Sequence, residues 1–383
     1  MHILVLPKWY PGRRDPQLGD FIRKQMLGVA LAHRVSVVAV APWSGEGERD
    51  ELDTDGGNRW ELRCHYPPSR SAFAPWRKAV NLVRYVRASL RGIRRVWAER
   101  GRPDLTHVHI LVRPALVAWW IERTRGVPYI LSEQSSEYLD GSWARKSGLF
   151  KAINRRLFRD AAAVTAVSAH LGDALKQHGL VQHYALVPNV VPGMDRPLPP
   201  TGPAGHFMVV ADLVDRTKNV SGVLRALGMA RHRGLDPQLD IIGDGPDREA
   251  LQELAHSLGI QGSVRWHGRL PNAEVLERMS LTGAVIINSN VETFSVVTGE
   301  ALALGKPVIA TRCGGPQAFI TPENGILIDV RDDHALADAL MELTGRKAGY
   351  RPEAVRATVH ARFSPLAICQ ALTTVYTEVL THG

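Results

Sequence analysis

Residues 290–311 read N-V-E-T-F-S-V-V-T-G-E-A-L-A-L-G-K-P-V-I-A-T and decide the fold of the chain. Short apolar runs at 284–287 and 308–310 flank the middle of this stretch, and each is typical of a buried strand. Between them we expect a helix over 295–304, with Ser295 as its N-cap and a glycine directly after it as its stop. A strand, a helix and a second strand in this order indicate an α/β domain with a mainly parallel sheet.

Two carboxylates in this stretch point to a ligand. Glu292 lies in the loop before the expected helix, and Glu300 lies about one and a half turns into it. Backbone N–H groups at a helix start are a natural seat for phosphate. A nucleotide-sugar, with hydroxyls at both ends and phosphates in the middle, suits this arrangement. The alternative is a surface helix after a buried strand, with two incidental glutamates.

The full string, E-T-F-S-x-x-x-G-E-A-L-A-L-G-K-P-V-I-A-T, resembles the E-x7-E segment of the family 4 retaining glycosyltransferases. The resemblance implies a GT-B fold, in which two Rossmann-like domains face each other across a cleft. It also implies a retaining, metal-independent transfer of sugar from a UDP- or GDP-linked donor to an acceptor hydroxyl, with no cofactor. Glu300 would bind the ribose, and Glu292 with the backbone after it, at Phe294, Ser295 and Val296, would hold the sugar and phosphates.

Length and composition set outer limits on the class of protein. The chain has 383 residues, 45% of them hydrophobic and 22% charged, which is enough for two domains of a soluble protein. We find no run of about 18 uncharged apolar residues and interpret residues 1–6 as a strand, not a signal peptide. The three cysteines show no metal-ligand spacing, so we expect a reduced, cytoplasmic setting. The net charge of +9 favours an anionic partner.

Proline and glycine divide the chain. Residues 192–203 contain five prolines and two glycines, which exclude regular structure. We therefore predict an acceptor-side Rossmann-like domain over 1–191 and a nucleotide-sugar-binding one over 204–363. In GT-B proteins a terminal helix, here 364–383, crosses back to the first domain. Six strands are predicted in the first domain, near 2–6, 35–41, 105–109, 128–132, 163–167 and 184–187.

The first domain carries three motifs of the family. W-Y-P followed by G-x-F-x-x-x-Q includes Gly19, which in the family lets backbone approach the donor, although a plain turn glycine is an equal alternative. D-x-x-H-x-H ends at His109, which by resemblance lies near the transferred sugar; a structural histidine is the alternative. Glu133 and Gln134 follow the next strand, and relatives often have a histidine at the second position. Glu133, like Glu137, could contact acceptor hydroxyls or be solvated.

In the second domain the family loop G-R-L…K-G supplies an arginine and a lysine for the pyrophosphate. Lys218 matches the lysine, whereas Asp212 occupies the place of the arginine. Arg216 is a substitute for the missing guanidinium or else a solvated loop charge. Preorganised cations stabilise the negative charge of a departing diphosphate, so some cation is required.

Two further loops resemble donor-binding segments of the family. The string I-I-G-D-G-P places Gly243 in a tight turn with Pro246 at the start of a helix. It lacks the G-x-G-x-x-G dinucleotide fingerprint. The string R-W-H-G-R-L-P, which contains His267 and Leu270, resembles the loop whose backbone meets the nucleobase.

Residues 77–102 form a basic segment with helical periodicity. Apolar residues recur there at spacings of three and four, among seven lysines and arginines in the stretch up to Arg95. One interpretation is a domain helix with a single core face. The other is peripheral contact with an anionic membrane, on its inner face, near a lipid-linked acceptor.

Two rival functions remain at this stage. A GT-B epimerase would convert the nucleotide-sugar with no acceptor present, and a phosphorylase would need a pyridoxal lysine that the chain does not display. A nucleic-acid-binding protein is suggested only by the basic charge, and no recognition motif supports it. We therefore expect a nucleotide-sugar donor, a small-molecule, saccharide or lipid-linked acceptor, and no nucleic acid.

Overall fold

The structure is a computed structural model that describes residues 1–13, 15–43, 45, 49–345 and 349–382. It divides into two compact units. Unit 1 comprises Met1–Val190 with Pro365–Gly383, and unit 2 comprises Val191–Ser364. Arg14, in the loop of the W-Y-P string, and Gly383, at the end of the predicted terminal helix, lie outside the described residues.

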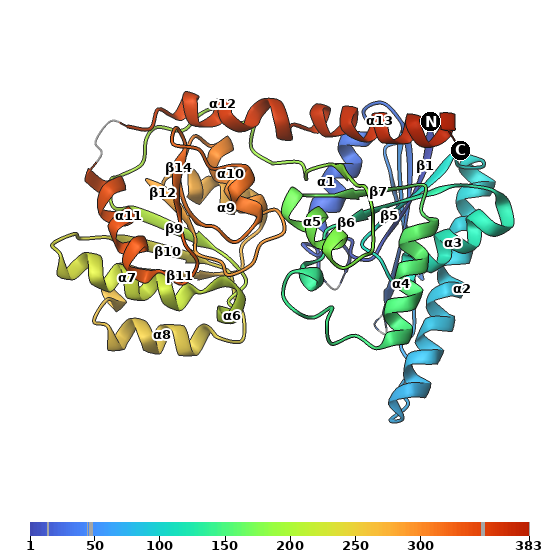
Figure 1. The fold of residues 1–383 in the computed structure, drawn as a ribbon, viewed down its shortest axis with the longest axis horizontal. Coiled ribbons are helices and arrows are strands. Elements are labelled where there is room, and N and C mark those ends of the chain that lie inside the picture. The colour runs from blue at the N-terminus through green and yellow to red at the C-terminus, as the bar shows by residue number, and fades with distance from the viewer. Residues whose placement is uncertain (14, 44, 46–48, 346–348, 383) are drawn as a thin grey trace. The chain divides into compact units, whose positions relative to one another are not determined.

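Unit 1 is built on an eight-stranded sheet in the order β3-β4-β2-β1-β5-β6-β7-β8 (Figure 1). Every neighbouring pair is parallel except β3 and β4. Its strands are β1 (His2–Pro7), β2 (Arg34–Pro42), β3 (Asp50–Thr54), β4 (Arg59–Tyr66), β5 (Leu105–His109), β6 (Tyr129–Glu133), β7 (Ala163–Ala166) and β8 (Ala185–Leu186). Its helices are α1 (Asp20–Val29), α2 (Ala74–Arg100), α3 (Arg113–Arg125), the short η1 (Ser136–Tyr138), α4 (Gly148–Asp160), α5 (Ala169–Gln177) and α13 (Pro365–His382).

The six strands predicted for this unit are confirmed as β1, β2, β5, β6, β7 and β8. Their buried apolar runs are typical of parallel strands covered on both faces. The β3–β4 hairpin was not predicted. β3 reads D-E-L-D-T and is an edge strand, where charged side chains remain in solvent.

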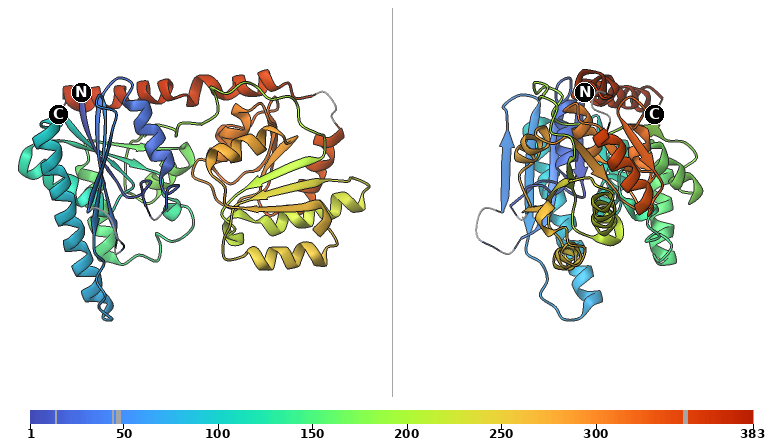
Figure 2. Two further views of the ribbon diagram at one scale, coloured as in Figure 1. Left: turned by 180° about the vertical axis from the view of Figure 1, so that it is seen from behind. Right: turned by 90° about the vertical axis from the view of Figure 1, so that its left-hand side faces the viewer.

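Helices cover both faces of the unit 1 sheet (Figure 2). On one face α1 packs against α13, and Ile368, Leu372 and Tyr376 of α13 share a buried apolar cluster with Ile3 and Val5 of β1. On the other face α2 contacts β2 and β4, while α3 contacts β5 and β6. The last helix of the chain therefore completes the core of the unit that contains the first strand.

Unit 2 is built on a six-stranded parallel sheet in the order β11-β10-β9-β12-β13-β14. Its strands are β9 (His206–Val210), β10 (Gln238–Ile242), β11 (Val264–Gly268), β12 (Ala284–Ile287), β13 (Val308–Thr311) and β14 (Gly325–Ile328). Its helices are α6 (Asp215–Lys218), α7 (Val220–His232), α8 (Arg248–Ser257), η2 (Gln261–Ser263), α9 (Asn272–Ser280), α10 (Val296–Ala303), η3 (Gly315–Ala318), α11 (Asp333–Gly345) and α12 (Pro352–Phe363). Apolar side chains of α7, α8 and α11 form one buried cluster with the sheet, and α9 and α10 lie on the opposite face (Figure 1).

Each sheet has one point where the strand order reverses. In unit 1, β1 lies between β2 and β5, and in unit 2, β9 lies between β10 and β12. Ligands of open parallel sheets bind at such a point, beyond the carboxyl ends of the strands. The loops that follow β1 and β5 in unit 1, and β9 and β12 in unit 2, are therefore the places to look for chemistry. Across the described residues, no helix combines the length and apolar content needed to span a bilayer.

Candidate functional site

In unit 2, the loops after β9 and β12 meet through an ion pair. Lys218, at the end of α6, donates from Nζ to Oε1 of Glu292 at 2.5 Å, and the hydroxyl of Ser289 donates to the same oxygen at 2.8 Å. Burial alone would lower the pKa of Lys218, but the Glu292 carboxylate outweighs it, so the pKa lies above its usual value. The lysine is therefore charged at neutral pH, at the point where the strand order reverses.

Backbone contacts hold Glu292 in place. Its N–H donates to the carbonyl of Cys313 at 3.0 Å, and its carbonyl accepts from the N–H of Gly315 at 2.9 Å. A side chain on Gly315 would lie 2.6 Å from the backbone of Phe294, so only glycine permits this approach. The Phe294 ring is itself buried against Phe319 and Phe363, at 4.8 and 5.7 Å between centroids. The side chain of Phe294 thus anchors the loop, and only its backbone remains for the predicted donor contact.

The start of α10 differs in detail from the prediction. Ser295 is the N-cap residue as expected, but the helix covers Val296–Ala303, and no side chain caps its first turn. The Ser295 hydroxyl instead bonds that of Thr298 at 2.7 Å, and its backbone is left-handed, with φ of 69°. The first N–H groups of a helix have no intrahelical partner. An uncapped turn directly after Glu292 is consequently suited to an anion.

Glu300 is buried within α10. Its Oε1 accepts from Nδ2 of Asn272, the first residue of α9, at 2.8 Å. The asparagine fixes the direction of the carboxylate. The two glutamates therefore have different neighbours, because Glu292 binds a cation and Glu300 binds a neutral amide.

The place of the missing family arginine is occupied by an ion pair that sequence reasoning did not identify. Asp212 accepts from the guanidinium of Arg269 at 3.1 Å, and both side chains are exposed. Arg269 lies between His267 and Leu270 of the predicted donor loop, so its position in the sequence pointed to the site. Its pairing with Asp212 could not be predicted, because the two residues are 57 positions apart. The exposed Arg216 contributes its backbone carbonyl, which accepts from Asn290 at 2.9 Å. Arg216 thus lies in α6 two residues before Lys218, and Arg269 lies on the loop after β11, paired with Asp212.

Gly243 is required by a close approach of backbone to backbone. Its φ is 134°, and a side chain there would lie 1.8 Å from the carbonyl oxygen of Ala211. The prediction that Pro246 begins the following helix is wrong, because α8 starts two residues later, at Arg248. Because Gly243 has no side chain, the loops after β9 and β10 can lie in contact at this turn.

His267 and Leu270 lie at the end of β11 and just beyond it. His267 Nε2 hydrogen-bonds Oδ1 of Asp240 at 2.9 Å, and His206 bonds the other oxygen at 2.7 Å. Burial would raise the pKa of Asp240, but these hydrogen bonds outweigh it and hold the pKa below its usual value. The His267 ring is thus held against the sheet, and the carbonyl of Gly268 accepts from the N–H of Gly243 at 2.8 Å. A role of His267 or Leu270 toward a donor stays a prediction.

In unit 1, His109 ends β5 and is fully buried. Its Nδ1 lies 3.5 Å from Nε2 of Gln134, and no described residue provides a hydrogen-bond partner for its Nε2. Burial lowers the pKa of His109 to about 3, so the ring is neutral at physiological pH. A buried nitrogen without a partner is costly, and this one is available to a ligand hydroxyl.

His107 lies on the same face of β5, and the two imidazole centroids are 4.0 Å apart. Both of its ring nitrogens have partners, the hydroxyls of Tyr376 at 2.8 Å and Ser132 at 2.6 Å. His107 is thus a structural histidine, whereas His109 is not satisfied in that way. Two of the three residues after His109 have positive φ: Ile110 with 63° and Val112 with 86°. Such values are strained for β-branched side chains.

Glu133 is not solvated, and its contact with an acceptor stays a prediction. It is buried, and its two oxygens accept from the backbone N–H groups of Leu111, Gln134 and Ser135 at 2.9–3.2 Å. Burial raises the pKa of Glu133, although these three donors oppose the shift. Glu137 is not simply solvated either, because it pairs with Lys146 at 3.0 Å. Glu133 is therefore the tie between the loops after β5 and β6.

Gly19 has a clear structural reason. It precedes α1 with φ of 71°, and a side chain there would lie 2.5 Å from the backbone of Trp9. This contact brings the W-Y-P loop against the start of the helix. A role of Gly19 toward a donor stays a prediction.

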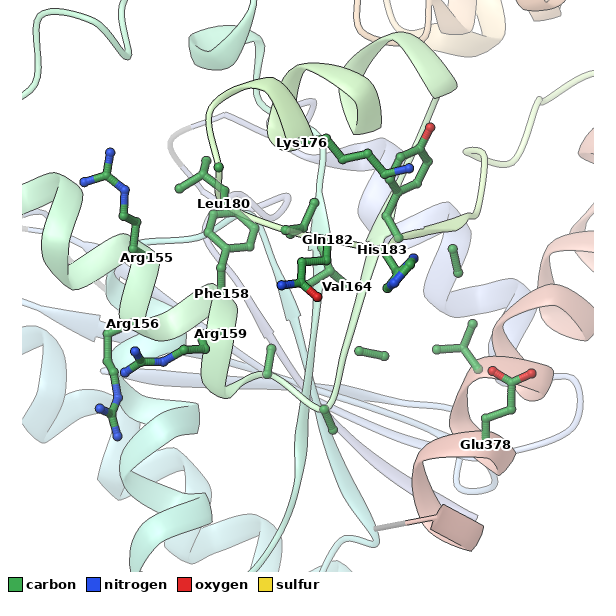
Figure 3. A pocket seen from close by; sticks show the side chains of 18 of the residues that line it. Arg155, Arg156, Phe158, Arg159, Val164, Lys176, Leu180, Gln182, His183 and Glu378 are labelled. Atoms are coloured by element: carbon green, nitrogen blue, oxygen red, sulfur yellow. The ribbon is translucent and has the colours of Figure 1, made fainter.

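A cavity of about 1280 Å³ opens elsewhere in unit 1 (Figure 3). It lies at the amino ends of β7 and β8, opposite the ends where ligands of such sheets bind. Arg155, Arg156 and Arg159 extend from α4 at its border, with Glu378 on α13 at another side. None of the predicted site residues lines it. In the described part of the chain, no group of three or more histidine, cysteine, aspartate or glutamate side chains could hold a metal ion.

Comparison with known proteins gives one family match in each unit. Residues 24–190 match the family described as glycosyl transferase 4-like domain, and residues 204–351 match the family described as glycosyl transferases group 1. The chain is 34% identical to the lipopolysaccharide core biosynthesis glycosyltransferase LpsD of Rhizobium meliloti over 188 residues, which are 46% of this chain and 52% of LpsD. It is 30% identical to the D-inositol 3-phosphate glycosyltransferase of Corynebacterium urealyticum over 268 residues, 63% of each chain. The alignments thus span about half to just under two thirds of these relatives.

Solved structures define the fold class. A sucrose-phosphate synthase from Thermosynechococcus elongatus superposes with a TM-score of 0.77 at 18% identity, over the whole of both chains. HepE of Anabaena, in a complex with UDP, superposes with a TM-score of 0.71 at 18% identity, over 99% of this chain and all of HepE. The fold is GT-B, as the resemblance predicted. Each of the two units also matches a family of glycosyltransferase domains.

Proposed function

We propose that the protein is a retaining glycosyltransferase that moves a sugar from a UDP- or GDP-linked donor to an acceptor hydroxyl. The observation that carries this proposal is the Lys218–Glu292 pair, which lies beside the uncapped start of α10 where the strand order of unit 2 reverses. A cation and free backbone N–H groups at one place suit a diphosphate. The E-x7-E spacing of Glu292 and Glu300 supports the same interpretation.

In unit 2, Lys218, Glu292 and Glu300 each have a proposed role in holding the donor. Lys218 stabilises the charge that develops on the departing nucleoside diphosphate, and the N–H groups at the start of α10 share this task. Glu300, oriented by Asn272, accepts from ribose hydroxyls. When the Lys218 ammonium also donates to the diphosphate, the Glu292 carboxylate can accept from hydroxyls of the sugar.

Arg269 is our proposed substitute for the family arginine, because it neutralises Asp212 at the position where the family has a cation. Without Arg269 the Asp212 carboxylate would repel a diphosphate. Arg216 is the second candidate. Because it is exposed, it could reach a phosphate without breaking an ion pair within unit 2.

For unit 1 we propose the acceptor side of the reaction. The unpaired Nε2 of the neutral His109 is suited to a hydroxyl of the transferred sugar, and Gln134 holds the other side of its ring. Glu133 shapes the loops without binding substrate. An acceptor that is a saccharide or a lipid-linked sugar agrees with the similarity to LpsD, a lipopolysaccharide core biosynthesis glycosyltransferase.

A UDP-linked donor is our first candidate, because related structures of HepE and of TarM were solved with UDP. The test is incubation with a panel of UDP- and GDP-sugars, with and without saccharide acceptors, followed by release of nucleoside diphosphate and NMR of the product anomer. The proposal requires release that depends on acceptor and a product with the donor's anomeric configuration. Conversion of the donor alone would favour an epimerase, and an inverted anomer would contradict the retaining mechanism.

A further inference from the structure

The two ends of α2 have different surroundings. Its second half packs on the sheet of unit 1 through buried residues that begin at Tyr85 and end at Val96. From Ala74 to Arg84 the helix has no buried residue. In Figures 1 and 2 these first turns extend past the other helices and strands of unit 1. About three turns of helix therefore bury no side chain. They are joined to the preceding segment by hydrogen bonds of Arg77 with Ser71, Asn81 with Ser69 and Arg84 with Pro67.

The exposed turns carry large apolar side chains. Phe73 is 68% exposed, Trp76 62% and Val83 50%. At about 100° per residue, these side chains lie within one sector of the helix, roughly opposite the sector of Tyr85, Gly92 and Val96 that packs on the sheet. The stripe is thus a second apolar face that the core of the unit does not use.

Positive charge lies on the same exposed turns, and Arg77, Arg84 and Arg87 are the cations nearest to the stripe. The sequence has no aspartate or glutamate between Glu61 and Glu99. Toward the packed end, Arg91 pairs with Asp50 at 2.6 Å and Arg95 with Glu99 at 2.6 Å. Within the described residues, the cations of the exposed end form no ion pair with a carboxylate; they are Arg77, Lys78, Arg84 and Arg87. The exposed end is therefore an uncompensated basic surface.

We propose that this end of α2, residues 73–87, binds the surface of an anionic lipid bilayer. Phe73 and Trp76 enter the headgroup region, where amphipathic aromatic rings are favoured. Arg77, Arg84 and Arg87 contact lipid phosphates, and their apolar stems lie along the stripe. This inference is independent of the sugar chemistry proposed above.

Other occupants fit less well. A second copy of the same surface would bring like charges together at short range, which costs free energy. A nucleic acid would satisfy the cations, but it would leave the apolar stripe of Trp76 and Val83 without a partner. A bilayer supplies both negative charge and an apolar layer.

The test is co-sedimentation of the whole chain with vesicles of phosphatidylglycerol and phosphatidylcholine in equal parts, at low salt. We expect binding that pure phosphatidylcholine vesicles do not support. The double variant Phe73→Ser/Trp76→Ser should bind about tenfold more weakly or worse. Arg77→Glu/Arg87→Glu should show a similar loss that shrinks as salt rises. Because all four side chains are exposed, the melting temperature should stay at the wild-type value.

Two matched controls locate the contact. Trp120→Ser removes another exposed tryptophan, and Arg155→Glu/Lys176→Glu reverses charge at the cavity of Figure 3; both should bind like wild type. Trp76→Phe should retain binding but lose the quenching of tryptophan emission by brominated lipid that wild type shows. The proposal is overturned if wild type ignores anionic vesicles, if the Phe73/Trp76 variant binds like wild type, or if the protein retains duplex DNA and not vesicles.

Discussion

Glu133 ends β6 in unit 1, and Glu292 lies in the loop after β12 in unit 2, so both are at the carboxyl edge of a parallel sheet. Glu133 is buried and accepts three backbone N–H groups. Glu292 accepts from a lysine ammonium and a serine hydroxyl instead. Backbone donors hold a loop in one shape, whereas a paired ammonium can be shared with an incoming anion. Carboxylates at the same edge of two parallel sheets thus serve structure in one unit and, by our proposal, catalysis in the other.

Lys218→Ala should have the largest effect of the changes that test this difference between the two glutamates. We expect kcat to fall about 10²–10³-fold, because the departing diphosphate loses its cation, with a much smaller effect on stability. The measurement is steady-state kinetics of nucleoside diphosphate release together with a melting curve. Lys151→Ala removes a lysine that donates to the carbonyl of Ala144, and it is the control that should keep full activity. Wild-type kcat in Lys218→Ala would remove the basis for a donor site in unit 2.

Glu133→Ala should act on stability. Three buried N–H groups lose their acceptor, so we expect the free energy of unfolding to fall by about 3 kcal/mol or more. Denaturant unfolding checks this value. Glu137→Ala removes one half-buried carboxylate that pairs with Lys146 and should cost clearly less, about 1 kcal/mol. A stable Glu133→Ala protein with lost activity would mean that Glu133 contacts substrate.

Unit 1 should lose stability in mild acid. Burial lowers the pKa of His109 to about 3 and that of His107 well below its usual value, while the unfolded chain titrates near 6.5. Since the unfolded state then binds more protons, this stability is complete above about pH 6.5 and is lost as the pH falls, by roughly 1.4 kcal/mol per pH unit for each histidine. Hydrogen exchange should show that unit 1 opens more readily at pH 5 than at pH 7. His109→Gln should reduce this difference between the two pH values. Earlier opening of unit 2 would contradict the assignment.

Arg269→Ala should have the smallest effect of the four, about fivefold weaker binding of nucleoside diphosphate, because the guanidinium is exposed. The exchange Asp212→Arg/Arg269→Asp keeps one cation on the same pair of loops and should restore most of the affinity. Titration calorimetry measures both. If Arg269→Ala binds like wild type and Arg216→Ala does not, Arg216 is the substitute cation.

The sequence predicted most of the fold because buried parallel strands leave continuous apolar runs. It failed at β3 and β4, where an edge hairpin carries charged side chains that hide the strand pattern. Helix boundaries depend on capping, so the starts of α8 and α10 moved by one or two residues from prediction.

The candidate site was predictable only where a motif names the residue. Lys218 and Glu292 were both predicted, and the structure brings them together although 74 residues separate them. The Asp212–Arg269 pair and the three N–H bonds of Glu133 were missed, because side-chain contacts over long separations leave no local pattern. The unpaired nitrogen of His109 likewise depends on what lies around it in three dimensions.

The central claim is that Lys218 and the start of α10 hold a nucleoside diphosphate. Titration calorimetry of UDP, GDP and ADP into wild type and Lys218→Ala tests it most directly. We predict that UDP or GDP binds wild type and that Lys218→Ala lowers its affinity about tenfold or more. If no nucleoside diphosphate binds wild type, or if the variant binds with wild-type affinity, the claim is wrong.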